Sequence, residues 1–208
     1  TGVGKTETVR LIAEAIYGRP DAFCRIDMNT LAQEHYAAAL TGAPPGYVGS
    51  KEGHSLFDET AIAGSHTRPG IMLFDELEKA SNEVIRGLMN VLDTGRLTLT
   101  AGTKTIDFRN CMVFMTSNVG AQAAQQYLDK LSYLPQKMQA LCLKRVPTQR
   151  IIEKVMQRKF DPEFLNRIDR SLHYQAVQHD ALPRLVKIEL DKLNKRLQPQ
   201  QRSVHLSA

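Results

Sequence analysis

The chain opens with the stretch Thr1-Gly2-Val3-Gly4-Lys5-Thr6, which matches the last six positions of the phosphate-binding loop pattern GxxxxGK[ST]. The two glycines let the backbone approach phosphate oxygens without an intervening Cβ atom. Lys5 supplies positive charge for the β- and γ-phosphates, and the Thr6 hydroxyl is the expected magnesium ligand. The first glycine of the pattern would precede Thr1. We therefore expect a piece of a longer protein, without the first strand that leads into the loop.

The rest of the sequence alternates strand-like and helix-like segments, which predicts an α/β fold. Strands that are apolar on both faces and separated by helices indicate a parallel sheet covered by helices on both faces. The expected strands are 23–28, 71–74, 111–115 and 172–177, with a hairpin over 96–109 that turns at Ala101-Gly102. The expected helices are 7–17, 31–40, 81–92, much of 121–160, and 181–198.

Two acids and an amide follow predicted strands. Asp75 and Glu76 end an apolar run, at the carboxyl end of a strand, where open α/β sheets place their ligand crevices. We expect Asp75 to hold magnesium and Glu76 to orient and deprotonate an attacking water. Asn118 ends another strand, so its amide is placed to position the same water. A cap on the following helix explains Asn118 equally well.

An arginine stands in the short segment FDPEFLNRID at residues 160–169. Arg167 is of the type that neutralises charge on a phosphoryl group bound by a neighbouring subunit. A surface ion pair with Asp169 is the better explanation from local sequence alone.

A glycine-bracketed loop follows two prolines in GAPPGYVG, residues 42–49. Tyr47 and Val48 form an apolar tip, and a tyrosine ring can hold an extended polypeptide without regard to its side chains. Packing of Tyr47 onto its own domain is an equally good interpretation.

Composition restricts the function classes. The 208 residues carry a net charge of +5, and 42% of them are hydrophobic. The excess charge lies in residues 134–170, with nine basic and four acidic residues but no interleaved aromatic platform, so we expect a protein-contact or solvated face and no nucleic acid partner. No apolar run approaches the roughly 20 residues of a membrane span, so no membrane partner is expected. Three scattered cysteines suit a reducing cytoplasm.

Together the motifs resemble the second ATPase module of the Clp/heat-shock family of AAA+ unfoldases. The matching words, in family order, are TGVGKTE, GAPPGYVG, IMLFDELEKA, GRLT, TIDFRN, MTSNVGA and FDPEFLNRID. The resemblance implies Walker A at Gly2–Thr6, Walker B at Asp75 and Glu76, and sensor 1 at Asn118. It also implies an arginine finger at Arg167 and a substrate-gripping pore loop at Tyr47.

The resemblance further implies ATP and Mg²⁺ as cofactors, a hexameric ring, and an unfolded or aggregated polypeptide as substrate. An AAA+ core would occupy residues 1–178, and residues 179–208 would begin the helical lid subdomain. The lid's sensor 2 arginine would lie beyond Ala208. Lys79-Ala80-Ser81-Asn82 stands where the family usually has KAHP, which leaves the subfamily open.

The function expected from this resemblance is an ATP-hydrolysing chaperone module that threads polypeptide through the ring. Residues 121–160, where peptidase-binding relatives carry their docking loop, contain no glycine, so we expect substrates to be released intact. Alternatives are a Clp-type ATPase dedicated to one substrate, such as a type VI secretion sheath, or to a peptidase partner. A DNA-directed AAA+ ATPase and a scaffold that binds nucleotide without turnover are two more.

Overall fold

A computed structural model describes residues 3–31, 57–99, 104–175, 177, 179–200 and 202–205. The described residues form two compact units that divide between Leu172 and His173. Several expectations lie outside the described residues, namely those on Thr1, Gly2, most of the helix 31–40, Tyr47 and Val48 in the glycine-bracketed loop, and the turn at 101–102.

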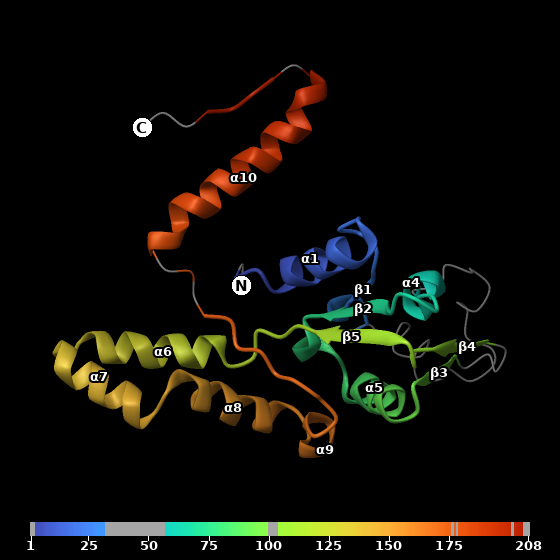
Figure 1. Ribbon diagram of the computed structural model, residues 1–208. Coiled ribbons are helices and arrows are strands. Elements are labelled where there is room, and N and C mark those ends of the chain that lie inside the picture. The colour runs from blue at the N-terminus through green and yellow to red at the C-terminus, as the bar shows by residue number, and fades with distance from the viewer. Residues whose placement is uncertain are drawn as a thin grey trace. The chain divides into compact units, whose positions relative to one another are not determined.

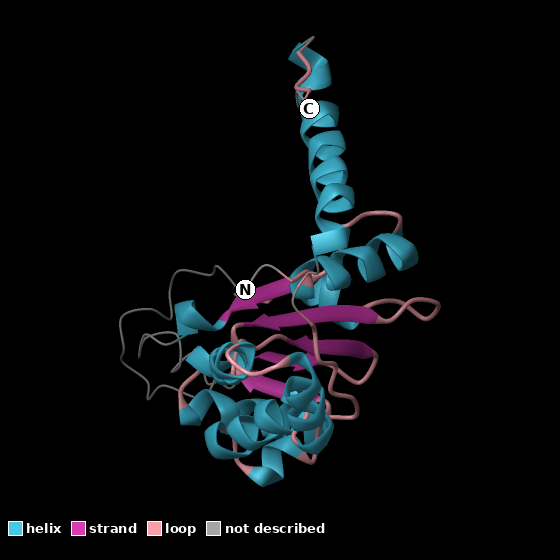
Figure 2. Ribbon diagram, turned by 90° about the vertical axis from the view of Figure 1, so that its left-hand side faces the viewer, coloured by secondary structure: helices cyan, strands magenta, loops and turns pink. Residues whose placement is uncertain are grey.

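A parallel sheet forms the centre of the first unit, in the order β1-β2-β5. β1 (Cys24–Asp27), β2 (Gly70–Asp75) and β5 (Cys111–Met115) run in the same direction (Figure 2). Every residue of the central strand β2 is buried, which the apolar run 71–74 predicts for those four residues, and Asp75 at the end of the strand is buried with them. The polar residues that end these strands therefore meet at one edge of the sheet.

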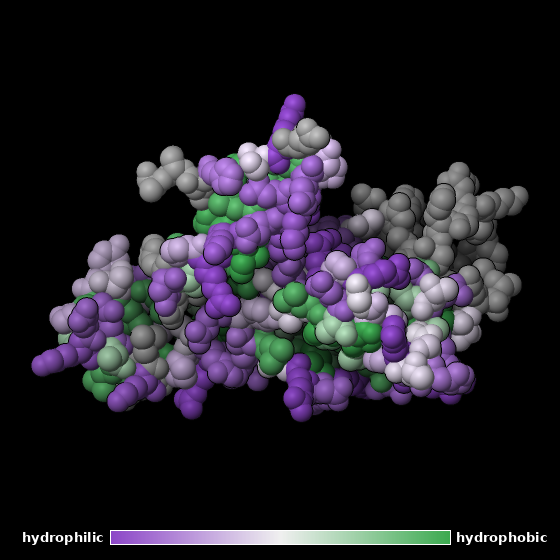
Figure 3. Space-filling view, turned by 45° about the horizontal axis from the view of Figure 1, so that its top comes forward, coloured by the Kyte–Doolittle hydropathy of each residue, from purple (hydrophilic) through white to green (hydrophobic). Residues whose placement is uncertain are grey.

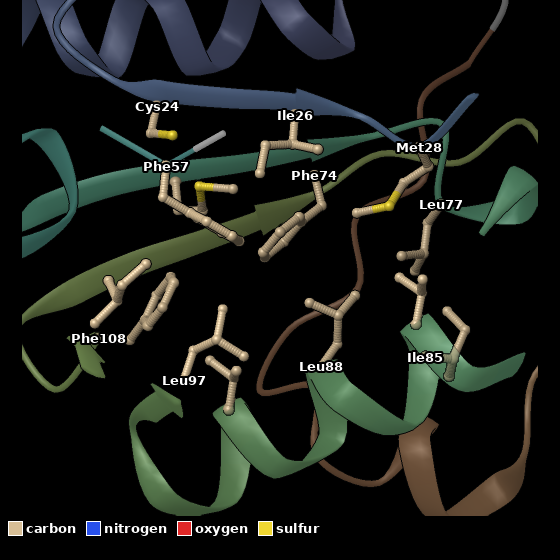
Figure 4. Close-up of a cluster of buried hydrophobic side chains, with 14 of the residues drawn as sticks. Cys24, Ile26, Met28, Phe57, Phe74, Leu77, Ile85, Leu88, Leu97 and Phe108 are labelled. Atoms are coloured by element: carbon tan, nitrogen blue, oxygen red, sulfur yellow. The ribbon is translucent and has the colours of Figure 1, made fainter. Parts of the chain in front are cut away.

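Helices cover both faces of this sheet (Figure 1). On one face, Val9 and Ala13 of α1 (Lys5–Tyr17) pack with Ile71 and Leu73 of β2. On the other face, α5 (Asn82–Thr94) buries Val84, Ile85, Leu88 and Val91 in a larger core with Phe74 and Leu97, part of which is drawn in Figure 4. The expected α/β fold, a parallel sheet with helices on both faces, is confirmed.

The remaining elements of the first unit surround this sheet. They are α2 (Met28–Leu31), α4 (Glu59–Ala63), η1 (Leu77–Lys79), β3 (Arg96–Leu99), β4 (Lys104–Asp107), α6 (Ala121–Ser132), α7 (Gln136–Arg145), α8 (Thr148–Lys159) and α9 (Pro162–Leu165). β3 and β4 pair antiparallel, which confirms the two strands of the expected hairpin. The helices expected in 121–160 are confirmed as α6, α7 and α8.

Local sequence explains where α5 begins and ends. The Ser81 hydroxyl accepts a hydrogen bond from the Val84 amide at 3.3 Å, the standard arrangement of an N-cap. Gly95 ends the helix with φ at 66°, in the left-handed region that favours glycine. The helix expected over 81–92 is thus confirmed as α5, which begins one residue later and ends two residues later than predicted.

One expected strand is wrong. Residues 171–175 and 177 form no strand, and the Leu172 side chain is 75% exposed. A strand requires a neighbour whose backbone pairs with it. All strands of the described residues lie between Cys24 and Met115, in the first unit, so the second unit offers the segment no partner within the described chain.

The second unit consists of η2 (His179–Ala181), α10 (Leu182–Leu197) and η3 (Gln198–Gln200). The amphipathic helix expected over 181–198 is confirmed as α10. Asn194 fixes the chain after the helix, since its Nδ2 donates to the Val204 carbonyl at 3.1 Å and its Oδ1 accepts from the Val204 amide at 2.8 Å. Its assignment as the start of a lid stays a prediction.

Hydrophilic residues, drawn in purple, cover much of the face shown in Figure 3 and separate smaller green hydrophobic areas. The largest exposed fractions among apolar side chains belong to Tyr133, Leu172 and Leu141. No helix within the described ranges is long and apolar enough to cross a membrane.

The core makes a direct prediction for stability. We expect Phe74→Ala to lower the free energy of unfolding by about 3–5 kcal/mol, because Phe74 is buried at the centre of the larger core and its removal leaves a cavity. Urea denaturation followed by circular dichroism measures this change. Tyr133→Ala, which truncates an exposed aromatic ring, is the matched control and should change stability by less than about 0.5 kcal/mol. Equal losses in the two variants would contradict the assigned core.

Candidate active site

The end of the phosphate-loop sequence leads directly into α1. Gly4 is the residue before the helix and has φ at 91°, a conformation that L side chains rarely adopt. The Thr8 amide and hydroxyl both donate to the Gly4 carbonyl, at 2.9 and 3.0 Å, which closes the first helical turn. The partly positive N-terminus of a 13-residue helix therefore lies at this loop, where it favours anions.

Lys5 reaches across the sheet edge to the segment that follows β5. Its Nζ donates to the Ser117 carbonyl and to the Asn118 Oδ1, both at 2.6 Å. Burial lowers the pKa of Lys5, and the negative charges of Glu78 and Asp75 partly offset that effect. The structure thus brings together two of the predicted residues, Lys5 and Asn118.

Asp75 is a buried carboxylate with four donors around it. Its Oδ2 accepts from the Arg25 Nη2 at 2.6 Å, from the Arg25 Nε at 3.0 Å and from the Thr6 hydroxyl at 3.3 Å. Its Oδ1 accepts from the Thr116 hydroxyl. Burial alone would raise the pKa of Asp75, but the hydrogen bonds from Thr116 and Arg25, the Arg25 charge and the Thr6 bond hold it below its usual value.

The predicted metal-ligating pair, Thr6 and Asp75, is brought together by these contacts. A hydroxyl and a carboxylate are hard oxygen ligands of the kind that Mg²⁺ takes. Within the described part of the chain no three His, Cys, Asp or Glu side chains cluster as a metal cage. Two protein ligands are enough for Mg²⁺, because this ion usually keeps several waters and binds through one or two protein ligands plus phosphates.

Glu76 adopts an unusual backbone conformation. Its φ and ψ are 59° and 50°, and among the described residues it is the one non-glycine with positive φ. The Glu76 amide donates to the Thr116 hydroxyl at 3.1 Å, which holds the turn against the end of β5. Its Oε2 accepts from the Asn29 Nδ2 at 2.5 Å. Asn29 is in turn held by Asp27, whose Oδ1 accepts from the Asn29 amide at 2.9 Å.

Asn118 is held from its backbone as well as its side chain. Its backbone amide donates to the Glu78 Oε1 at 3.0 Å, while the Glu78 Oε2 is buried without a hydrogen-bond partner. The residue before α6 is Gly120, and that helix has no side-chain cap. Asn118 therefore does not act as the side-chain cap of α6, and its amide oxygen is used by Lys5 instead.

Arg167 contacts none of these residues through a hydrogen bond or ion pair described in the structure. Its Nε donates to the Asp93 Oδ1 of α5 at 2.5 Å, and its Nη1 and Nη2 donate to the backbone and side chain of Glu163 at 2.7 and 3.1 Å. The hydrogen bond to Asp93 and the two acidic partners raise the pKa of Arg167. The local ion pair exists, with partners other than Asp169. The role of Arg167 at a neighbouring subunit stays a prediction.

Sequence reasoning missed four residues at this sheet edge, namely Arg25, Asn29, Glu78 and Thr116. Two of them had a signal in the sequence. Arg25 is a charge within an otherwise strand-like segment, and Thr116 directly follows the apolar run 111–115, as Asp75 follows the apolar run 71–74. Nothing in the local sequence distinguishes Asn29 or Glu78 from ordinary surface residues.

Comparison with known families gives one match that covers most of the chain. Residues 1–171 match the family described as AAA domain (Cdc48 subfamily). The matched range contains the sheet and every residue of the site described above.

Several curated proteins are similar to this chain. An ATP-dependent protease ATP-binding subunit-like protein AmiB from Pseudomonas aeruginosa is 49% identical over 200 residues, covering 95% of this chain and 54% of that protein. Chaperone protein ClpB from Gloeobacter violaceus is 38% identical over 208 residues, covering all of this chain and 22% of that protein. The chain thus spans about half the length of its Pseudomonas relative and less of the chaperone.

Solved structures give the same result for the fold. The chain superposes on Hsp104 bound to ATPγS and casein with a TM-score of 0.71 at 30% identity, covering 94% of this chain and 31% of that one. A Saccharomyces cerevisiae Hsp104–casein complex gives 0.70 at 31% identity, with the same coverage. With its parallel sheet, its phosphate-loop lysine and its strand-end acids, the chain belongs to the AAA domain family (Cdc48 subfamily), as a Clp-type AAA+ ATPase module.

Proposed function

We propose that this module binds ATP with Mg²⁺ and hydrolyses it to drive the unfolding or disaggregation of polypeptides. The observation that carries the proposal is the convergence of Lys5, Thr6, Asp75 and Asn118 at the carboxyl ends of β2 and β5. This is the edge at which open α/β sheets bind their ligands. A basic amine, a hydroxyl and a carboxylate there supply what a nucleoside triphosphate requires.

Lys5 and the N-terminus of α1 would bind the phosphates, together with Thr1, Gly2, Val3 and Gly4 of the loop. Lys5 would exchange its bonds to Ser117 and Asn118 for phosphate oxygens, which leaves the Asn118 amide available to a water. Thr6 and Asp75 would hold Mg²⁺, whose charge stabilises the negative charge that develops on the phosphoryl group.

Glu76 is proposed as the general base. Glu76 follows Asp75 directly, at the end of β2, and its backbone has the left-handed conformation with φ at 59°. In the structure Asn29 donates to the Glu76 Oε2, and the other carboxylate oxygen can accept a proton from water while that hydrogen bond is kept. Asn118 would orient the same water.

The polypeptide substrate and the ring are supported by relatives. Two similar Hsp104 structures contain casein, and the chaperone ClpB is 38% identical to this chain. We propose a hexameric ring in the cytoplasm in which Tyr47 and Val48 contact the translocating chain. Arg167 would reach the nucleotide of the adjacent subunit once it exchanges Asp93 and Glu163 for the phosphoryl group.

A peptidase-coupled role is the second candidate. The similar protein from Pseudomonas aeruginosa is named as a protease ATP-binding subunit-like protein. Against this role, the stretch that would carry a docking loop is occupied by α6, α7 and α8, which leave only short connections. A single dedicated substrate, such as a type VI secretion sheath, stays a further alternative. The basic residues of 134–170 give no reason to prefer DNA.

The first prediction concerns the general base. Glu76→Gln in the full-length protein should keep ATP affinity and lower the hydrolysis rate at least about 100-fold, because the amide cannot accept the proton of water. Phosphate release measures turnover, and calorimetry measures nucleotide affinity. Glu14→Gln, an exposed change on α1, is the control and should leave both unchanged. Near-normal turnover in Glu76→Gln would remove Glu76 from the mechanism.

The second prediction concerns Arg167. Arg167→Ala should lower turnover about 1000-fold, the low end of arginine-finger effects. Mixing it with Lys5→Ala, also inactive, should restore activity, because one subunit then supplies the lysine and its neighbour the arginine. Arg158→Ala, an exposed change near the end of α8, is the control and should retain activity. Normal hydrolysis by Arg167→Ala at every protein concentration would show that the assignment is wrong.

The third prediction separates release from degradation. The full-length protein, mixed with ClpP peptidase, ATP and a labelled unfolded substrate, should leave the substrate intact, because no docking loop is evident in residues 121–160. Gel electrophoresis follows the label. ATP-dependent appearance of peptides would favour the peptidase-coupled role instead.

A further inference from the structure

Arg25 lies beside the proposed metal ligand because of strand register. In the parallel pair β1–β2, Arg25 is opposite Leu73 and Asp27 is opposite Asp75. Side chains alternate between the two faces of a strand, so Arg25, Leu73 and Asp75 share one face. The long arginine side chain spans the two-residue offset and places its Nη2 2.6 Å from the Asp75 Oδ2.

The Arg25 guanidinium donates hydrogen bonds to the Asp75 oxygen that a metal bound by Thr6 and Asp75 would use. Thr6 and Arg25 both donate to the same atom, Asp75 Oδ2, whereas Oδ1 is used by Thr116. A cation held jointly by Thr6 and Asp75 therefore competes with Arg25 for one carboxylate oxygen. Two positive groups at hydrogen-bond or coordination distance from one atom repel each other.

We propose that Arg25 is a resident counter-cation, which neutralises Asp75 when the site holds no metal and is displaced when Mg²⁺ enters with the nucleotide. This inference rests on the proposed function, because it concerns the Mg²⁺ that the ATP site takes. It assigns to Arg25 the role of setting how much Mg²⁺ the site requires. Arg25 is a positioning residue in this account, since it acts through Asp75.

The unequal exposure of the two partners decides which one moves. The Arg25 side chain is 46% exposed and the Asp75 side chain 9%. Leaving the pair returns the arginine to water at little cost, whereas an unpaired buried carboxylate is costly. The exchange is therefore possible only when another cation replaces the arginine at Asp75. Lys5 is a second cation that Asp75 acts on electrostatically, but its Nζ is bonded to Ser117 and Asn118.

The alternative is that Arg25 supports Asp75 in every state, as a fixed strut. The two roles predict opposite effects. Removal of a competitor strengthens Mg²⁺ binding, whereas removal of a support leaves Asp75 misplaced and weakens it.

The experiment measures binding of a fluorescent ADP analogue to the full-length protein across a Mg²⁺ series. Arg25→Ala should lower the Mg²⁺ concentration at half-maximal binding by about 3- to 10-fold, the effect of removing one positive charge next to the ligand oxygen. Without Mg²⁺ and nucleotide, the same variant should melt at a lower temperature than the wild type. Addition of Mg²⁺ with ADP should raise the melting temperature of the variant by more than it raises that of the wild type.

Two further variants complete the test. Arg109→Ala removes an equally charged arginine whose Nη2 lies 2.6 Å from an exposed acid, Asp107, and should leave the Mg²⁺ midpoint unchanged. Arg25→Lys keeps the charge but not the two-donor geometry, and should shift the midpoint in the same direction by a smaller factor. It also serves if Arg25→Ala does not fold.

An unchanged or higher Mg²⁺ midpoint in the Arg25 variants, with normal binding by the wild type, would overturn this inference alone. Absence of nucleotide binding by the wild type at every Mg²⁺ concentration would overturn the proposed function as well.

Discussion

A carboxylate buried at the end of an apolar strand is the constraint on which the site depends. Asp75 closes β2, whose residues are all buried, and a charge in that position requires partners. Arg25 from β1, Thr6 from α1 and Thr116 after β5 provide them. Satisfying one buried charge thus draws three separate elements to the same sheet edge. The nucleotide site that we propose is built from the groups that this requirement assembles.

Much of this arrangement follows from the sequence. The apolar runs at 71–74 and 111–115 predict buried strands, and the carboxyl ends of parallel strands meet at one edge. That argument was enough to expect Lys5, Asp75 and Asn118 near one another, and the contacts of Lys5 and Asn118 agree. The helix expected over 81–92 is likewise present as α5, because the apolar spacing that predicts it lies within its own residues.

The contacts that the sequence does not predict depend on strand register and on partners distant in sequence. Whether Arg25 reaches Asp75 is decided by which residue of β1 lies opposite which residue of β2, and alternation alone does not fix that. The partner of Arg167 is Asp93, 74 positions away on α5, and the nearby acid Asp169 was the wrong choice. The segment 172–177 has strand composition, but composition supplies no neighbour with which to pair.

Gly120 joins the site to the helices α6–α8. Its φ is 80°, and a Cβ there would lie 2.9 Å from the Ile152 Cα of α8, so the backbone of one element rests directly on the other. α6 and α8 pack together, and α6 begins at Ala121, three residues after Asn118. A residue larger than glycine at position 120 would therefore have to push α6 and α8 apart, within three residues of Asn118.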